Sequence, residues 1–383
     1  MKEKSEYLNK FHESIFAKMS ALAKSTGAVN LGQGFPDFEG PSFVSKYLIE
    51  GVQAGHNQYA PSPGYLPLRS ALSEIYKNRY QLEYCPETEI SITTGATEGI
   101  FSTITALVNP GDEVVIFEPF YDSYVASVEM RGGIPKFVSL GGSEFNFDEG
   151  ELKNAFSGKT KLVILNTPHN PTGKVFSDTE LGLIRDLVIK YDSYVISDEV
   201  YEYLTFDDHE HTPVSKIDGL KERTIVISSA GKTFGYTGWK VGWCLAPRDI
   251  SAAIRLTRQY ITFSVNTPAQ YAFSKCLTEI DNYLPEFQKL YDGKRLMVMK
   301  ALDDLGWRYF RPRGTYFIMA SLEGVSDLGD VDFCMDLIKK AGVVFIPPSV
   351  FYRKSNEGKR WVRICFAKSD QTLKSAIDKL SLY

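Results

Sequence analysis

Residues 90–117 read ISITTGATEGIFSTITALVNPGDEVVIF, and the fold class is recognised from this segment first. Its two ends, Ile90–Thr94 and residues 113–117, are short apolar runs that are typical of buried strands. Between them, residues 97–108 repeat apolar side chains at helical spacing. A strand, a helix and a second strand in this order predict a βαβ crossover between parallel strands.

The same alternation continues along the chain. Strand-like runs follow at residues 161–165, 194–197 and 224–228, and residues 178–190 form a helical pattern that we expect Asp178 to cap. The pattern predicts an α/β fold with a mainly parallel sheet covered by helices on both sides. After about residue 275, a long helix and a mixture of short strands and helices predict a smaller α+β domain. We expect an N-terminal arm with part of the small domain at 1–42, a large domain at 43–275 and a small C-terminal domain at 276–383.

Composition excludes several classes of protein. The 383 residues carry a formal net charge of −4 with 43% hydrophobic and 23% charged residues, which is typical of a soluble globular protein. Without a basic tract we expect no nucleic-acid partner, and without a long apolar segment we expect neither a secretory signal nor membrane insertion. The five cysteines are scattered and His209-Glu210-His211 has no third ligand nearby, so we expect no disulfide framework and no metal site. These features favour a cytoplasmic location.

Small and polar residues follow the predicted strands at the point where each strand ends. They are Gly95-Ala96-Thr97, Glu118-Pro119-Phe120-Tyr121, Asn166, Asp198-Glu199-Val200-Tyr201 and Ser229-Ala230-Gly231-Lys232. Ligands of open α/β sheets bind outside the carboxyl ends of the strands. Each residue has a structural reading when taken singly, as a turn former, a helix cap or a surface side chain. One ligand, however, accounts for all of them together.

One part of this predicted site suits a phosphate group. The helix that starts at Gly95-Ala96-Thr97 offers free backbone N–H groups and the positive end of a helix dipole. Ser229 could add a hydroxyl group and Lys240 a positive charge.

The other residues suit a pyridine ring that carries an aldehyde. Asp198, if buried beside the ring nitrogen, would keep that nitrogen protonated. Asn166 and Tyr201 could hydrogen-bond a phenolate oxygen on the ring, and Tyr121 could stack on its face. Lys232, with its pKa lowered by burial and nearby positive charge, could bond covalently to the aldehyde carbon.

Longer motifs around these residues resemble one family. They include Ser229-Ala230-Gly231-Lys232-Thr233-Phe234, Asn166-Thr167-Pro168-His169-Asn170-Pro171-Thr172-Gly173, Ser197-Asp198-Glu199-Val200-Tyr201 and Asn30-Leu31-Gly32-Gln33-Gly34-Phe35-Pro36-Asp37-Phe38. From about residue 12 to the C-terminus, the chain is similar to the class I/II aminotransferases of fold type I. The closest likeness is to the branch of kynurenine aminotransferases, glutamine transaminases and bacterial methionine aminotransferases. The resemblance implies a mainly parallel seven-stranded sheet and pyridoxal 5′-phosphate as cofactor.

The resemblance also implies roles for single residues. It implies a cofactor site made of Ala96, Thr97, Tyr121, Asn166, Asp198, Tyr201, Ser229, Lys232 and Lys240, in which Lys232, Asp198 and Tyr201 are catalytic. Lys232 resembles the lysine that holds the cofactor and carries a proton from the substrate Cα. Arg363 resembles the arginine that binds the substrate α-carboxylate, with Gly34 and Asn166 as further substrate contacts. Tyr59 resembles a tyrosine that reaches the phosphate in the neighbouring subunit, which implies a homodimer with shared active sites.

The expected reaction moves the amino group of a large neutral amino acid to a 2-oxo acid. Such donors (methionine, glutamine, aromatic amino acids or kynurenine) would suit an aromatic pocket of Phe35, Tyr59, Phe263, Tyr316 and Phe351. We find no second arginine at a family position for a distal carboxylate, so aspartate is not expected as the best donor. Pro348 stands where many relatives have glycine or a small apolar residue, which changes the expected pocket wall.

Three alternatives use the same residues differently. A carbon–sulfur β-lyase acting on cysteine S-conjugates would share the lysine anchor and the first steps of the reaction. A non-catalytic protein that binds pyridoxal phosphate would usually carry a DNA-binding module, for which the chain has no spare length. Ser229-x-x-Lys232 also matches a motif of penicillin-binding proteins and β-lactamases, but the chain lacks their Ser-Asp-Asn and Lys-Thr-Gly partners.

Overall fold

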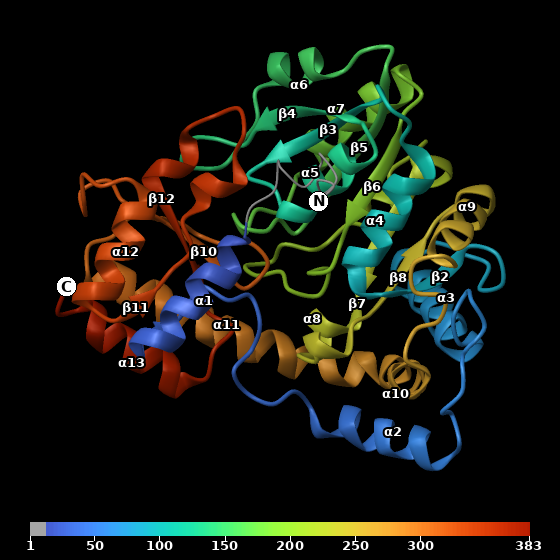
Figure 1. The fold of residues 1–383 in the computed structure, drawn as a ribbon, viewed down its shortest axis with the longest axis horizontal. Helices are drawn as coiled ribbons and strands as arrows, with labels where there is room; N and C mark the ends of the chain where they lie inside the picture. Colours follow the sequence, from blue (N-terminus) through green and yellow to red (C-terminus); the bar gives the residue numbers. More distant parts are fainter. Residues whose placement is uncertain (1–12) are drawn as a thin grey trace, which may run out of the picture.

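The structure, a computed structural model, describes residues 13–383, so the first twelve residues of the predicted N-terminal arm lie outside the described residues. Its main feature is a seven-stranded sheet with the strand order β2-β8-β7-β6-β5-β3-β4 (Figure 1). The strands are β2 (Ile90–Thr94), β3 (Glu113–Glu118), β4 (Ile134–Ser139), β5 (Thr160–Asn166), β6 (Tyr194–Asp198), β7 (Thr224–Ser229) and β8 (Val241–Leu245). Only β8 runs antiparallel to its neighbours β2 and β7. This confirms the predicted α/β fold with a mainly parallel sheet.

Two strands of this sheet, β4 and β8, lie outside the runs predicted as strands. β4 is an edge strand, and its Pro135 and Lys136 interrupt the apolar pattern at a position where an unpaired side tolerates proline. β8 is short and contains Gly242. Because β8 is antiparallel to both neighbours, β2 runs in the same direction as β7. The carboxyl ends of β2, β5, β6 and β7 therefore meet at one edge of the sheet.

Helices cover both faces of the sheet. They are α4 (Gly95–Leu107), α5 (Asp122–Met130) and α9 (Arg248–Arg258) on one face, and α6 (Glu149–Ala155) and α7 (Asp178–Lys190) on the other. Successive side chains of a strand point to opposite faces of the sheet. In β5, Val163 packs with α6 and α7, whereas Ile164 packs with α4 and α5. This alternation makes the central strands apolar throughout, which explains why they were recognisable from the sequence.

The predicted cap of α7 was wrong. The N-cap residue is Ser177, whose side chain accepts a hydrogen bond from the backbone N–H of Glu180. The Glu180 carboxylate accepts one in return from the Ser177 backbone N–H at 2.9 Å. Asp178 is instead the first residue inside the helix, because this reciprocal capping box satisfies the helix start one residue earlier.

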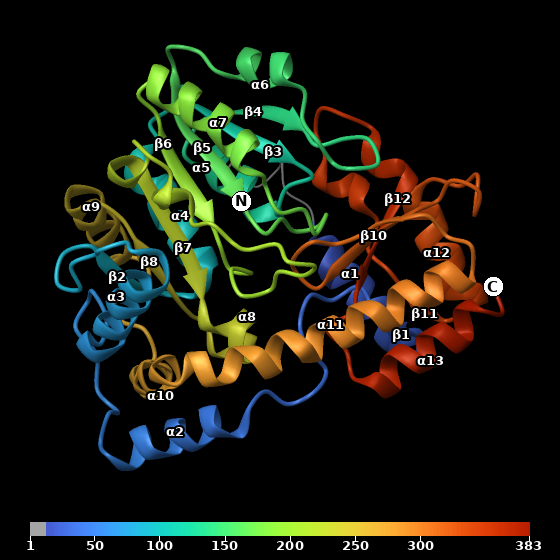
Figure 2. The ribbon, with the colours of Figure 1, turned by 180° about the vertical axis from the view of Figure 1, so that it is seen from behind.

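The C-terminal part of the chain forms two small sheets flanked by helices. Its elements are α11 (Ile280–Asp304), β9 (Tyr309–Phe310), β10 (Phe317–Ser321), α12 (Asp330–Lys340), β11 (Val343–Val344), β12 (Trp361–Cys365) and α13 (Asp370–Leu380). β12, β10 and β9 form one antiparallel sheet, and β11 pairs in parallel with β1 (Val29–Asn30) from the start of the chain. Helix α1 (Ile15–Thr26) lies beside them (Figure 2). The predicted long helix and the short strands after it are confirmed.

The remaining helices are α2 (Ser42–Gln53), α3 (Leu66–Tyr80), α8 (Ala230–Phe234) and α10 (Thr267–Thr278). Of these, α2, α8 and α10 lie below the large sheet as drawn in Figure 1, and α3 lies beside β2. α10 packs against both α2 and α3, and α11 extends from it toward the C-terminal elements (Figure 2). Within residues 13–383, no helix combines the length and the apolar character needed to cross a membrane. The domain boundaries at residues 42 and 275 stay a prediction.

Candidate active site

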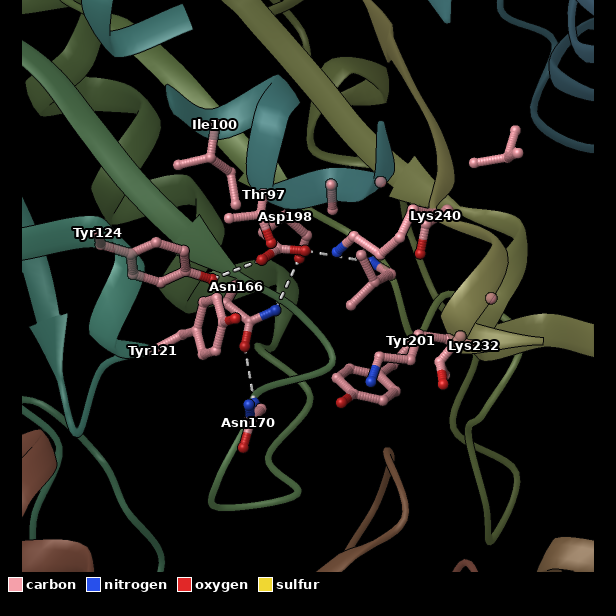
Figure 3. A pocket seen from close by; sticks show the side chains of 17 residues that line it. Thr97, Ile100, Tyr121, Tyr124, Asn166, Asn170, Asp198, Tyr201, Lys232 and Lys240 are labelled. Carbon is pink, nitrogen blue, oxygen red and sulfur yellow. Dashed lines mark hydrogen bonds between the residues drawn. The ribbon is translucent and has the colours of Figure 1, made fainter. Parts of the chain in front are cut away.

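A cavity of about 160 Å³ opens at the carboxyl edge of the large sheet, beside the start of α4 (Figure 3). Its lining includes these residues of the predicted site: Ala96, Thr97, Tyr121, Asn166, Asp198, Tyr201, Ser229, Lys232 and Lys240. Asn166, Asp198 and Ser229 are the last residues of β5, β6 and β7, and the others lie in the helices, turns and loops beside this edge of the sheet. The structure thus brings the predicted cofactor residues together, as the strand-end argument expected.

Asp198, at the end of β6, is the buried carboxylate of the cavity. The hydroxyl of Tyr124 donates to its Oδ2 at 2.6 Å, and the backbone N–H of Val200 donates to Oδ1 at 3.4 Å (Figure 3). Burial raises the pKa of Asp198 from 3.8 to about 6, although these two hydrogen bonds favour the charged form. The carboxylate is therefore poorly solvated and would be stabilised by a positive charge in the cavity.

Tyr124 was not predicted as a site residue. It lies in the first turn of α5, three residues after Tyr121, and both tyrosines line the cavity. The spacing was visible in the sequence, because residues three apart share one helix face. The contact between Tyr124 and Asp198 was not visible in the sequence, because 74 residues separate the two in the chain.

Asn166, at the end of β5, is fixed by two hydrogen bonds. Its Nδ2 donates to the backbone carbonyl of Asp198 at 2.8 Å, and its Oδ1 accepts from the backbone N–H of Asn170 at 2.7 Å (Figure 3). Asn170 also lines the cavity, and its Oδ1 accepts a hydrogen bond from Nη1 of Arg363 at 3.1 Å. Asn170 thereby joins the cavity to Arg363, a link that the sequence motif containing Asn170 did not reveal.

Lys232, in α8, is the amine of the cavity. Its Nζ donates to the backbone carbonyl of Gly34 at 3.0 Å and to the hydroxyl of Tyr316 at 2.9 Å. Burial lowers the pKa of Lys232 from 10.5 to about 8, with an opposing contribution from Cys365 and a supporting one from Arg363. An appreciable fraction of the amine is therefore neutral near pH 7 to 8 and able to act as a nucleophile or base.

The start of α4 forms the opposite end of the cavity. Gly95 has φ +70°, and a Cβ added there would meet Nζ of Lys240 at 3.0 Å. A Cβ on Gly242 would meet the Gly95 carbonyl carbon at 2.6 Å and the Ala96 nitrogen at 2.8 Å. The two glycines thus let β8 and Lys240 approach the helix start closely. Free N–H groups, a helix dipole and an ammonium group together suit a phosphate, so this end of the cavity fits the phosphate of the implied cofactor.

Arg363 and Gly34 lie next to the cavity rather than among its lining residues. Arg363 is 1% exposed, and its Nη2 donates to the Gly32 carbonyl at 2.7 Å. Its Nε is buried and has no hydrogen-bond partner within the described chain. An unpaired buried donor costs about 1–3 kcal/mol, which a bound carboxylate would relieve. This orphaned N–H is what a carboxylate-binding arginine is expected to show without its substrate.

Tyr59 and most residues of the predicted aromatic pocket lie outside the lining of the cavity. Tyr59 is 80% exposed, and its ring centroid is 5.4 Å from that of Phe263. Neither residue lines the cavity, and neither do Phe35 or Phe351. Tyr316 of this set contacts two cavity residues, through its hydrogen bond with Lys232 and its edge-on ring contact with Tyr201. The predicted aromatic set is therefore not part of the cavity lining, although Phe351 lies beside Arg363, with its ring centroid 5.7 Å from the guanidinium carbon.

Pro348 begins a single 3-10 turn, Pro348–Phe351. The first helical position has no need of a backbone N–H donor, so proline is compatible with it.

Metal-binding groups are not assembled in the part of the chain that the structure describes. Among residues 13–383, no cluster of three or more histidine, cysteine or acidic side chains could hold an ion. His211 instead pairs its Nε2 with Glu199 at 2.9 Å.

Comparisons with known proteins bear on this site. The family described as aminotransferase class I and II matches residues 26–380. A kynurenine–oxoglutarate transaminase from Dictyostelium discoideum is 42% identical, over 98% of this chain and 95% of that protein. A methionine aminotransferase from Escherichia coli (strain K12) is 43% identical, over 96% of this chain and 95% of that protein. The solved structure of N-succinyldiaminopimelate aminotransferase from Mycobacterium tuberculosis has a TM-score of 0.95 at 40% identity and covers 99% of both chains.

The chain therefore belongs to the class I and II aminotransferases. It is a transaminase, an enzyme that moves an amino group between an amino acid and a 2-oxo acid. A carbon–sulfur lyase or a non-catalytic binding protein is not favoured, because the matching family and these relatives are named for transamination.

Proposed function

We propose that the cavity binds pyridoxal 5′-phosphate and that Lys232 holds it covalently. One observation carries the proposal: a buried carboxylate, an amine of lowered pKa and the free start of α4 all face the same cavity. These groups are complementary to a ring nitrogen, an aldehyde and a phosphate, respectively. When bound, the cofactor supplies a carbon that receives the amino group and a protonated ring that withdraws electrons from the substrate Cα.

Three residues would hold the ring. The Asp198 carboxylate would bind the proton-bearing ring nitrogen, and the positive charge there would compensate for the burial of Asp198. Asn166 and Tyr201, which line the cavity near Asp198, would donate hydrogen bonds to the ring oxygen. Tyr121, on the α5 side of the cavity in Figure 3, would cover one face of the ring.

The phosphate would lie at the start of α4. Ala96 and Thr97 would donate their backbone N–H groups, Ser229 its hydroxyl and Lys240 its ammonium group. This arrangement combines helix-dipole and ion-pair attraction for a dianion.

The substrate would bind between the cavity and Arg363. The guanidinium group would bind the α-carboxylate through its free Nε–H, with Asn166 and the Gly34 backbone as further contacts. This places the amino group and Cα toward Lys232. As a neutral amine, Lys232 would accept the proton from Cα and return it later in the reaction.

The proposed donors are large neutral amino acids, such as methionine, glutamine, aromatic amino acids or kynurenine, and the acceptors are 2-oxo acids. Two relatives are named for methionine and kynurenine. In this chain, three aromatic rings lie within 6 Å of the Arg363 guanidinium carbon, those of Phe16, Phe317 and Phe351. These rings would favour an apolar substrate side chain. A panel of donors and 2-oxo acids tests this, and a preference for aspartate or for an acidic N-succinylated donor would overturn it.

We also propose a homodimer with shared active sites in which Tyr59 reaches the phosphate of the partner. Support comes from exposed aromatic side chains in a single chain: Tyr59 is 80% exposed, and its ring centroid lies 5.4 Å from that of Phe263, which is 45% exposed. Groups of this kind are common at subunit interfaces. We place the enzyme in the cytoplasm, in keeping with its scattered free cysteines.

The experiment is a covalent trap at Lys232. The protein is loaded with pyridoxal phosphate, reduced with borohydride and mapped by mass spectrometry. We expect a visible absorption band before reduction and a pyridoxyl adduct on Lys232 after it, both lost in Lys232→Ala and kept in the control Lys216→Ala, an exposed lysine. Colourless wild-type protein, or an adduct spread over surface lysines, would show the proposal to be wrong.

A further inference from the structure

The amine of Lys232 is held by two acceptors that the proposed cofactor contacts do not include. It donates to the Gly34 carbonyl at 3.0 Å and to the Tyr316 hydroxyl at 2.9 Å. The Tyr316 hydroxyl donates its own proton to the same Gly34 carbonyl. The three groups therefore form a closed triangle in which the amine uses two N–H bonds.

This triangle decides where the lone pair of the neutral amine points. A neutral primary amine has two N–H bonds and one lone pair, so engaging both N–H bonds turns the lone pair away from the two acceptors. Gly34 and Tyr316 lie outside the cavity lining, whereas Lys232 is part of it. The lone pair is thus directed toward the cavity, where the proton to be removed would be.

Tyr316 is held rigidly in its place. Its side chain is fully buried, with the Tyr201 ring edge-on at 5.1 Å and the Tyr291 ring stacked at 6.0 Å. The preceding residue, Thr315, has φ +64°, a left-handed conformation that is strained for a β-branched side chain. Such strain persists only where the surrounding structure enforces it, and it is common near functional sites. The backbone N–H of Thr315 donates to the Leu204 carbonyl at 3.0 Å, which ties this turn to the loop after β6.

The loop whose Gly34 carbonyl accepts a hydrogen bond from Lys232 also accepts one from Arg363. Nη2 of Arg363 donates to the Gly32 carbonyl, two residues before the carbonyl that binds Lys232. The amine is therefore held on the side of the site where the substrate carboxylate would bind. From that side it can reach the substrate Cα, which is bonded directly to that carboxylate.

We propose that Tyr316 is a positioning residue of the transamination: with the Gly34 carbonyl, its hydroxyl orients the free amine of Lys232 for proton transfer at the substrate Cα. In that step the lone pair of the amine takes the Cα proton, and the C–H electron pair stays with the substrate. The resulting ammonium keeps both acceptors and points its third N–H bond, which carries the transferred proton, into the cavity. The inference rests on the proposed function, because it requires Lys232 to carry that proton.

The test compares Tyr316→Phe with the control Tyr291→Phe. Each change removes one hydroxyl from a buried tyrosine of the same stack, but only that of Tyr316 bonds to Lys232. For Tyr316→Phe we expect kcat to fall roughly 3- to 10-fold, the equivalent of one hydrogen bond, with KM changed less than about twofold. The primary isotope effect on an α-deuterated donor should rise, because proton transfer becomes slower than the other steps.

A second readout does not depend on turnover. In cofactor-free protein with 13C-labelled lysine, the Lys232 resonance is assigned by its loss in Lys232→Arg, and its pKa is measured by NMR. Removing an acceptor disfavours the ammonium, so Tyr316→Phe should lower this pKa by about half a unit to one unit, whereas Tyr291→Phe should leave it unchanged. Should Tyr316→Phe not fold, 3-fluorotyrosine at position 316 keeps the ring and weakens the acceptor. Burial holds the pKa of Tyr316 well above 10, so the fluorinated hydroxyl stays neutral and the Lys232 pKa should still fall.

The outcomes separate this inference from the proposed function. If wild-type protein attaches pyridoxal phosphate at Lys232 and transaminates, while Tyr316→Phe matches Tyr291→Phe in isotope effect and Lys232 pKa, only the role of Tyr316 is overturned. If wild-type protein fails the covalent trap, the proposed function falls first and the role of Tyr316 with it.

Discussion

Replacing Asp198 by asparagine should stabilise the cofactor-free protein at neutral pH. Asp198 is buried at the end of β6, and its pKa in the folded protein is raised from 3.8 to about 6. Between these two values the unfolded chain loses the carboxyl proton while the folded protein keeps it. The free energy of unfolding of wild type therefore falls as pH rises from about 4 to about 6, and it stays lowered above that range. Asparagine has no charge to bury, so the free energy of unfolding of Asp198→Asn should not fall over this pH range.

The size of the expected stability difference follows from the pKa shift of Asp198. A difference of about 2 pKa units corresponds to about 3 kcal/mol at about 1.4 kcal/mol per unit. We expect urea unfolding of the two cofactor-free proteins to give similar free energies at pH 4, and Asp198→Asn to be more stable by about 2–3 kcal/mol at pH 7.5. Pyridoxal phosphate should reverse the order, because a protonated ring nitrogen stabilises the ionised Asp198 of wild type and offers asparagine much less.

The control is Asp327→Asn, an exposed carboxylate on the C-terminal part of the chain. In Asp327→Asn, the change in the free energy of unfolding between pH 4 and pH 7.5 should equal that of wild type. A stability difference between wild type and Asp198→Asn that does not change between pH 4 and pH 7.5 would show that burial does not raise the pKa of Asp198. So would a wild-type protein that gains stability over Asp198→Asn as pH rises in the absence of cofactor.

Three further changes have expected outcomes. Tyr124→Phe removes the 2.6 Å hydrogen bond to Asp198 and should raise the carboxyl pKa further, by about one unit, measured by 13C NMR of the cofactor-free protein; an unchanged pKa would argue against this contact. Arg363→Lys replaces a planar two-bond donor by a point charge and should raise KM for the amino donor about 10- to 100-fold, with a smaller effect on kcat. Equal increases in KM for donors with and without an α-carboxylate would contradict that role. Gly242→Ala should lower stability by about 1–3 kcal/mol and weaken cofactor binding, because the new Cβ meets backbone atoms that cannot yield. Gly238→Ala, whose Cβ would meet nothing within 4 Å, is its matched control in thermal unfolding.

Local patterns were sufficient for five of the seven strands of the sheet and for the residues at their ends. Asn166 ends β5 and Asp198 ends β6, so reading the strands correctly was enough to bring both side chains to one edge. β8 escaped prediction although Lys240 and Gly242, at its start, shape the cavity. Its glycine and short length weaken the period-2 signal, and only pairing with β2 and β7 makes it a strand.

The amino-acid sequence alone was enough to recognise the α/β alternation, the strand ends and the set of amine, carboxylate, amide and helix start that the cavity contains. These depend on periodicity and on spacing over a few residues, which a single chain displays directly. The groups that hold this set in place became visible only in the folded chain. Tyr124 meets Asp198 across 74 residues, Tyr316 meets Lys232 across 84 and Arg363 meets Asn170 across 193. Such contacts depend on how α5, β10 and β12 pack against the sheet edge, and packing between distant elements leaves no periodic trace in the sequence.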